Sequence, residues 1–183
     1  LLVCTGFRPG GATERVTMSK AIHWRAMTTL DLPVIEAIAA SVHPAFPEDI
    51  VVFAERQRLY PDGTRLLELD GEPAGYILSH PWRFGALPAL NSLLGAIPDD
   101  ADTYYLHDLA LLPAARGTGA AAMIVGDMLR HARLGGFANA SLVAVNGSLP
   151  FWYKHGFREV PATELAQKLA SYEAAARLMV KRF

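Results

Sequence analysis

The chain has 183 residues, of which 51% are hydrophobic and 19% are charged, a composition typical of one globular domain with a substantial core. The formal net charge of -1 excludes a molecule that is drawn as a whole to nucleic acid or to an anionic membrane. The single cysteine, Cys4, excludes an internal disulfide and a cysteine-based metal cluster, so the simplest expectation is a reducing, cytoplasmic setting.

The opening stretch LLVCTGFRPGGATERVT, residues 1–17, does not resemble a folded element. It lacks a basic start followed by a long apolar stretch, as a secretory signal would have. The sequence also has no run of 18 apolar residues that would predict a membrane span. We expect residues 1–17 to be a flexible leader and residues 18–183 to form a single domain.

The first part of the domain is predicted to be a strand followed by two helices. Alternating residues predict a strand over 21–27. A helix is predicted over 29–43, where Asp31 is a candidate cap and Pro33 falls in the first turn. A second helix is predicted over 47–60, because it opens on acidic residues and closes on Arg and Tyr.

Two strands and a long loop follow. Residues 65–69 and 74–80 are predicted to be strands joined by the tight turn DGEP. Residues 81–100 are apolar but broken by Pro and Gly, which predicts a long loop or a short helical excursion. Loops of that length in compact domains are often functional.

The strongest predicted strand and helix come next. TYYLHDLALL, residues 103–112, predicts a strand that ends at Pro113. Residues 118–133 predict a helix that stops at the glycines of LGG, residues 134–136. The residues expected on one apolar face of this helix are Ala121, Ile124, Val125, Met128 and Ala132.

Shorter elements complete the chain. They are a strand over 137–145, a short helix over 149–156, a strand over 157–160, a helix over 162–170 and a final strand over 176–183. The main order, β-α-α-β-β-β-α-β-α-β, predicts an α/β fold with a mixed sheet and helices on its faces.

The stretch LLPAARGTGAAAMIV, residues 111–125, places glycines at the start of the strongest helix, where uncovered N–H groups attract an anion. A P-loop would need Lys and then Ser or Thr after Gly119, but Ala120 and Ala121 follow it. A dinucleotide fingerprint fits Gly117, Gly119 and Ala122, but the next strand offers no carboxylate for the ribose hydroxyls.

A third pattern accounts for more of the sequence. Arg116, Gly119 and Ala121 resemble motif A of the GNAT N-acetyltransferase superfamily, Q/R-x-x-G-x-G/A. VNGSLPFWYKHGF, residues 145–157, resembles motif B of the same family. The residues that match motif B are Asn146, Tyr153, Gly156 and Phe157. The resemblance covers roughly residues 20–160, weakly in the first half and well in the second.

The resemblance implies an acyl-CoA N-acyltransferase fold, whose mixed, mostly antiparallel sheet has about six or seven strands with helices on both faces. It implies acetyl-CoA as the cofactor and CoA as the product, with the pyrophosphate held at the glycine loop. The pantetheine arm would pair with the strand before that loop. The residues implied to bind the cofactor are Leu109, Ala110, Leu111, Arg116, Gly117, Thr118, Gly119, Ala120, Ala121, Asn146 and Tyr153.

The resemblance also implies catalytic roles. Transfer to an amine needs a base for the nucleophile and is helped by an acid for the departing thiolate. Tyr153 matches the family tyrosine that often serves as that acid. LHDLAL resembles the histidine-bearing strand of family members that acetylate arylalkylamines, which implies His107 as the base, with Asp108 as the fallback. Neither role needs a metal.

Strand alternation along 104–111 is expected to place His107 on one face and Asp108 on the other. The face shared with His107 would carry Tyr105, Leu109 and Leu111. His80 is a candidate for the acceptor side. Three other histidines are expected to be surface or cap residues: His43, His131 and His155.

The expected function is direct acetyl transfer to a primary amine of a small molecule or peptide. Residues 31–60 and 81–100 would form the acceptor wall, and Trp82 and Phe84 favour an amine with an apolar part. Nucleic acid and membrane are not expected partners, and a homodimer is compatible with the apolar segment 87–97. The alternatives are a non-catalytic acetyl-CoA-binding regulatory domain and, more remotely, a nucleotide-binding oxidoreductase.

Overall fold

A computed structural model describes residues 20–161 and 163–183, so the leader predicted over residues 1–17 lies outside the described part. Seven strands form one sheet in the order β1-β2-β3-β4-β5-β7-β6. The strands are β1 (Ile22–Ala26), β2 (Thr64–Leu69), β3 (Glu72–Trp82), β4 (Thr103–Leu111), β5 (Asn139–Ala144), β6 (Arg158–Glu159) and β7 (Arg177–Arg182). All neighbours are antiparallel except β4 and β5, which confirms the predicted fold class.

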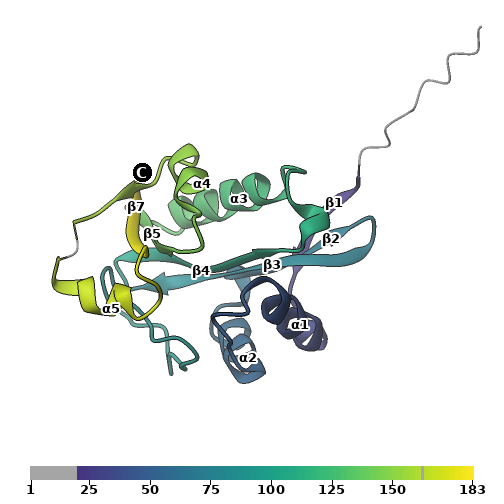
Figure 1. The fold of residues 1–183 in the computed structure, drawn as a ribbon, viewed down its shortest axis with the longest axis horizontal. Helices are drawn as coiled ribbons and strands as arrows, with labels where there is room; N and C mark the ends of the chain where they lie inside the picture. Colours follow the sequence, from purple (N-terminus) through teal and green to yellow (C-terminus); the bar gives the residue numbers. More distant parts are fainter. Residues whose placement is uncertain (1–19, 162) are drawn as a thin grey trace, which may run out of the picture.

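Helices cover both faces of this sheet. They are α1 (Leu32–Val42), α2 (Ile50–Leu59), α3 (Ala120–Leu134), α4 (Leu149–Lys154) and α5 (Ala166–Ala170). Figure 1 shows α3 and α4 on one face and α1 and α2 on the other. Among the described residues, none of the helices has the length and apolar character needed to cross a membrane.

Helix starts lie later than the sequence patterns indicated. α2 begins at Ile50 and α3 at Ala120, because the residues before them form the caps and turns. Asp31 precedes α1 as predicted, but its side chain does not cap that helix. It accepts hydrogen bonds from the Thr28 backbone and from both terminal nitrogens of Arg25, at 2.7 and 2.8 Å.

Periodicity predicted the buried face of α3 with one exception. On α3, Ile124, Val125, Met128 and Ala132 are buried as expected. Ala120 is buried in place of Ala121, which is only half-buried. The helix therefore turns the first of its alanines inward and leaves the second facing a cleft.

The parallel pair β4 and β5 is joined over a short length. Only Tyr104 with Ala140 and Tyr105 with Ser141 are paired across it. Beyond Tyr105 the two strands separate, so one edge of β4 has no strand beside it on the β5 side. This separation leaves space for the cleft described below.

A β-bulge interrupts β4 at His107. Leu78 of β3 lies opposite Asp108, and the next residue, Ser79, lies opposite Leu106, so His107 has no partner. The extra residue breaks the alternation of side chains. The predicted faces are therefore wrong across the bulge: Leu106 and Leu109 both pack in the core beneath α3, whereas His107 and Asp108 point together to the side of α1 and α2.

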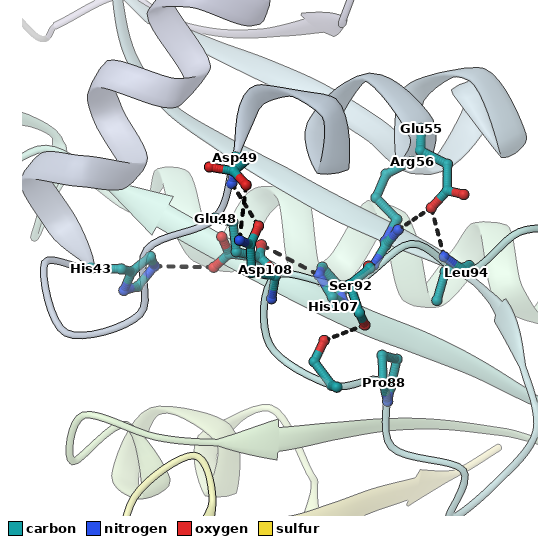
Figure 2. A network of polar contacts seen from close by, with 12 residues as sticks. His43, Glu48, Asp49, Glu55, Arg56, Pro88, Ser92, Leu94, His107 and Asp108 are labelled. Atoms are coloured by element: carbon teal, nitrogen blue, oxygen red, sulfur yellow. Dashed lines mark hydrogen bonds and ion pairs between the residues drawn. The ribbon is translucent and has the colours of Figure 1, made fainter.

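The loop between β3 and β4 is anchored by a buried ion pair on α2. Arg56 Nη1 lies 2.5 Å from Glu55 Oε2, and Arg56 Nη2 donates to the Ser92 carbonyl at 2.8 Å. Glu55 accepts the backbone N–H groups of Leu94 and Gly95 at 2.7 and 2.9 Å. Figure 2 shows this pair reaching from α2 to the loop. The structure describes every residue between Trp82 and Thr103 and has no helix or strand there, which confirms the predicted long loop over most of residues 81–100.

Candidate active site

The glycine loop forms an open turn into α3. Gly117 and Gly119 have φ values of 75° and 92°, in the left-handed region that favours glycine. A Cβ atom added at either glycine would meet no other atom within 4 Å, so both face open space. Gly119 is the residue that precedes α3, and its backbone turns the chain directly into the helix.

The backbone N–H groups of this turn are partly used. Thr118 donates its hydroxyl to the Ala115 carbonyl at 2.7 Å and accepts the N–H of Ala120 at 3.3 Å. Within the described part of the chain, the N–H groups of Gly119 and Ala121 make no hydrogen bond. Free N–H groups at the start of a fifteen-residue helix form a site for an anion.

A cleft of about 730 Å³ runs from this turn along the gap between β4 and β5. Four of the residues that the resemblance implied for the cofactor line one end of it: Arg116, Gly117, Gly119 and Ala121. Thr118 and Ala120 do not line it, because both take part in the local capping described above. Its lining also includes Leu109, Leu111, Asn146 and Trp152.

Two of the three β4 residues implied to bind the cofactor line the cleft. Leu109 and Leu111 line the cleft, while Ala110 is fully buried against the α1 core. Arg116 extends back along this strand, and its Nε donates to the Leu111 carbonyl at 3.1 Å. The loop and the end of β4 are thus tied together at the mouth of the cleft.

The structure does not bring Tyr153 to the cleft. Its hydroxyl donates to Glu159, it lies beneath the Arg158 guanidinium, and 39% of the residue is exposed. The two preceding residues, Phe151 and Trp152, line the cleft. α4 is a helix of six residues in which each residue turns the side chain by about 100°, so the next residue, Tyr153, points away from the cleft.

A second cavity, which we term the inner chamber, adjoins the deep end of the cleft. It has a volume of about 80 Å³. Its lining residues are His43, Phe46, Glu48, Pro88, Ala89, Leu90, Tyr105, His107, Asp108, Val143, Val145 and Tyr172. His43, His107 and Asp108 line both the chamber and the cleft, so they mark the junction between the two.

His43 and Asp108 form one acid–histidine pair at this junction. His43 Nε2 lies 3.0 Å from Asp108 Oδ1, at ion-pair distance but outside hydrogen-bond angles. Tyr76, which is fully buried, donates its hydroxyl to Asp108 Oδ2 at 2.5 Å. Figure 2 shows His43 reaching Asp108 from the end of α1.

The ion pair shifts the pKa values of both residues in the direction opposite to burial. Burial by itself raises the pKa of Asp108, but the His43 ring and the Tyr76 hydroxyl lower it overall. Burial lowers the pKa of His43, yet Asp108 and Glu48 together raise it above its ordinary value. The pair therefore favours a carboxylate facing an imidazolium.

His107 and Glu48 form the second pair. His107 Nε2 lies 3.7 Å from Glu48 Oε2, and its Nδ1 is buried without a hydrogen-bond partner among the described residues. The ring of His80 lies 5.8 Å from that of His107. Burial lowers the pKa of His80 to about 3, so His80 stays neutral and adds no charge beneath the chamber.

Sequence reasoning missed His43 and Glu48. His43 follows α1 as a predicted cap residue, but its side chain is only 17% exposed and turns to Asp108. Both residues lie in the connection between α1 and α2, where no periodic pattern reports direction. The chamber is also lined by fewer residues of the β3–β4 loop than expected. Residues 88–90 line it, whereas Trp82 and Phe84 do not.

Comparisons with known proteins agree with this architecture. A model of the family described as "Acetyltransferase (GNAT) family" matches residues 26–157. The loading GNATL domain of CurA from Lyngbya majuscula has a TM-score of 0.70 at 15% identity, over 88% of this chain and 98% of that one. No curated protein sequence gave a match.

Two further solved structures contain coenzyme A derivatives. Naa50 of Arabidopsis thaliana, in complex with the bisubstrate analogue CoA-Ac-MVNAL, has a TM-score of 0.69 at 13% identity, over 88% of this chain and 99% of that one. GphF, a GNAT-like decarboxylase in complex with isobutyryl-CoA, has a TM-score of 0.69 at 19% identity, over 87% and 98%. At these identities the likeness establishes the fold alone.

Proposed function

This chain belongs to the GNAT family of acetyltransferases, and we propose that it transfers the acetyl group of acetyl-CoA directly to a primary amine. The observation that carries the proposal is the junction of two cavities. A long cleft with an anion site at its mouth meets a small chamber that contains two acid–histidine pairs. One cavity suits the acyl donor, and the other suits the acceptor.

The cleft fits the acyl donor. Free N–H groups at Gly119 and Ala121, together with the start of α3, suit a pyrophosphate, and Arg116 adds a positive charge nearby. The unpaired edge of β4 suits the amide groups of a pantetheine arm. Binding of CoA derivatives by Naa50 and GphF supports this assignment. The donor supplies the acetyl group as a thioester.

The chamber fits an amine that arrives as an ammonium ion. Among the described residues, its lining holds the carboxylates of Glu48 and Asp108 and contains no Lys or Arg. Aromatic and aliphatic side chains form the rest of the wall. We therefore propose a small or peptidyl primary amine with an apolar part, without a carboxylate next to the amine.

His107 is the proposed base. It lines the chamber, its Nδ1 is free of hydrogen bonds within the described chain, and Glu48 can stabilise the charge that it gains. The bulge at His107 turns this ring to the same side as Asp108. Tyr153 has no part in the proposal, because its hydroxyl is bonded to Glu159 outside the cleft.

The test is release of free CoA thiol, measured with a thiol reagent, from acetyl-CoA and a panel of amines. The panel contains a phenylalkylamine, a peptide with an apolar N-terminus, a polyamine and an amino acid. We expect turnover with the first two and a loss of kcat in His107→Gln. Binding of acetyl-CoA without turnover of any amine would contradict the proposal and favour a non-catalytic acetyl-CoA-binding domain.

A further inference from the structure

The junction contains a second histidine that base catalysis does not use. His43 lines both the cleft and the chamber, and its side chain is 17% exposed. We propose that His43, held by Asp108 and Tyr76, is the general acid that protonates the thiolate of CoA as it departs. This inference rests on the proposed function, because it assigns the second proton transfer of that reaction.

Two elements hold the His43 ring in place. α1 ends at His43, and Asp108 of β4 faces its Nε2 at 3.0 Å. Asn146, which follows β5 and lines the cleft, has its Nδ2 3.4 Å from Nδ1 of the ring; an amide N–H can donate to this nitrogen only when it carries no proton, so the contact places Nδ1 beside the cleft but does not hold the imidazolium. The ring therefore spans the gap between the two separated strands, with Nδ1 on the side of the cleft.

Asp108 fixes the ring and supports its charge. Tyr76 donates to the second oxygen of Asp108, so the carboxylate is held from both sides and has little freedom to turn away. An oriented histidine that is supported by a buried carboxylate is a recurrent arrangement in acyl-transfer enzymes. Asp108 and Tyr76 are positioning residues in this scheme, since they act through His43.

The charges around His43 favour an imidazolium. The groups that face it are Asp108 from β4, Glu48 from the connection between α1 and α2, and Arg116 from the glycine loop. Two carboxylates oppose one guanidinium, and the pKa of His43 is raised although burial acts against it. A histidine whose charged form is favoured in this way can give a proton to a thiolate.

Other side chains at the cleft cannot take this role. The Tyr153 hydroxyl points to Glu159, and Trp152 offers only an indole N–H, which donates to Ser148 at 3.2 Å. The amide of Asn146 is not an acid under physiological conditions. His107 lies deeper against Glu48 and already serves as the base.

The proton balance of the reaction closes with two histidines. The acceptor ammonium gives one proton to His107, and the neutral nitrogen forms a bond to the thioester carbonyl carbon. The carbon–sulfur bond then breaks, and the sulfur takes a proton from His43. The nitrogen gives up its second proton to restore His43, and His107 releases its proton to solvent. The products are the amide, CoA as the free thiol and one proton.

The experiment compares donors whose leaving groups differ in their need for an acid. Wild type, His43→Gln and His107→Gln are assayed with acetyl-CoA and with S-(4-nitrophenyl) thioacetate, whose acidic thiol departs as the thiolate. With acetyl-CoA we expect His43→Gln to lower kcat about 100-fold, within the usual contribution of a general acid. With the nitrophenyl donor its deficit should shrink to a few fold, whereas His107→Gln should be equally slow with both donors.

The pH profile supplies an independent readout. Wild-type kcat should fall as pH rises through the raised pKa of His43, because the acid loses its proton, and His43→Gln should lack this basic limb. Asp108→Asn keeps the side-chain shape but removes the charge, so its basic limb should move to lower pH. This second variant tests the inference even where His43→Gln folds poorly.

The outcomes separate the two proposals. Equal deficits of His43→Gln with both donors, at unchanged acetyl-CoA affinity, would overturn the acid role, as would a kcat equal to that of the wild type. Absence of turnover by the wild type with every amine would overturn the proposed function and this inference with it. Tyr153→Phe serves as the matched control and should leave kcat unchanged with acetyl-CoA.

Discussion

Gly119→Leu should abolish most of the affinity for acetyl-CoA while leaving the fold intact. Gly119 has a φ of 92° and lines the cleft, with open space where a side chain would project. A leucine there would cover the free N–H groups at the start of α3. The anion site would be lost by obstruction and not by a clash within the protein.

Backbone strain must be separated from this effect. A side chain in the left-handed region costs about 1–2 kcal/mol, whatever its surroundings. Gly71, in the turn between β2 and β3, has a φ of 86°, also faces open space and does not line the cleft. Gly71→Leu is therefore the matched control, and both variants should lower Tm by about 2–8 °C.

Ligand binding should then distinguish the two variants. A hydrogen bond to a charged group contributes about 1.5–3 kcal/mol, so losing one weakens binding roughly 10- to 150-fold. At a ligand concentration 100 times the wild-type Kd, acetyl-CoA should stabilise the wild type by about 2.7 kcal/mol. After a 100-fold loss of affinity, Gly119→Leu would gain only about 0.4 kcal/mol.

Thermal unfolding with and without acetyl-CoA measures this difference directly. We expect a ligand-induced rise in Tm of about 5–11 °C for the wild type and for Gly71→Leu. For Gly119→Leu the rise should be about 1–2 °C. An equal ligand-induced shift in all three proteins would refute the assignment of the anion site to the glycine loop.

Three further predictions concern the chamber and the fold. Glu48→Gln should lower kcat/KM for the amine about 10-fold or more while KM for acetyl-CoA is unchanged, because Glu48 lines only the chamber. Steady-state kinetics measures both constants, and a rise in both KM values would contradict this prediction. Glu55→Gln leaves Arg56 as an uncompensated buried charge and should lower the free energy of unfolding by about 3–5 kcal/mol. Denaturant titrations measure this change, and a loss below about 1 kcal/mol would contradict the prediction. Arg25 holds the pKa of Asp31 far below its usual value, so this stabilisation is complete above the unfolded pKa of about 3.9 and is lost progressively as pH falls from there through the folded pKa. Asp31→Asn should therefore cost about 1–3 kcal/mol at pH 7 and distinctly less at pH 2, and an equal cost at both would contradict the ion pair.

Local patterns predicted the elements and the glycine loop, because each depends on residues that are close in sequence. Apolar spacing placed α3, and two glycines before it indicated an anion site that the open turn supports. The short helix α4 shows the limit of such patterns. Phe151, Trp152 and Tyr153 are consecutive aromatic residues, so spacing alone cannot tell which of them faces inward.

The acid–histidine pairs depended on information from distant strands. The bulge at His107 arises from the register between β3 and β4, which no feature of β4 alone reveals. Likewise, His43 and Glu48 reach the chamber only because α1 and α2 pack on this face of the sheet. Figure 2 shows both residues beside His107 and Asp108. Irregular backbone at the centre of a site has to be found in three dimensions.

The bulge also bears on the proposal that one strand serves both the donor and the acceptor. In a regular strand, His107 and Asp108 would point to opposite faces, and only one of them could meet the acceptor. One extra residue turns both toward the chamber, while Leu109 still lines the cleft beneath α3. The same stretch of β4 thus presents an open backbone edge to the cleft proposed for the donor and two ionisable side chains to the chamber proposed for the acceptor. The separation of β4 from β5 leaves room for the cleft, and the bulge directs the side chains of His107 and Asp108 into the chamber.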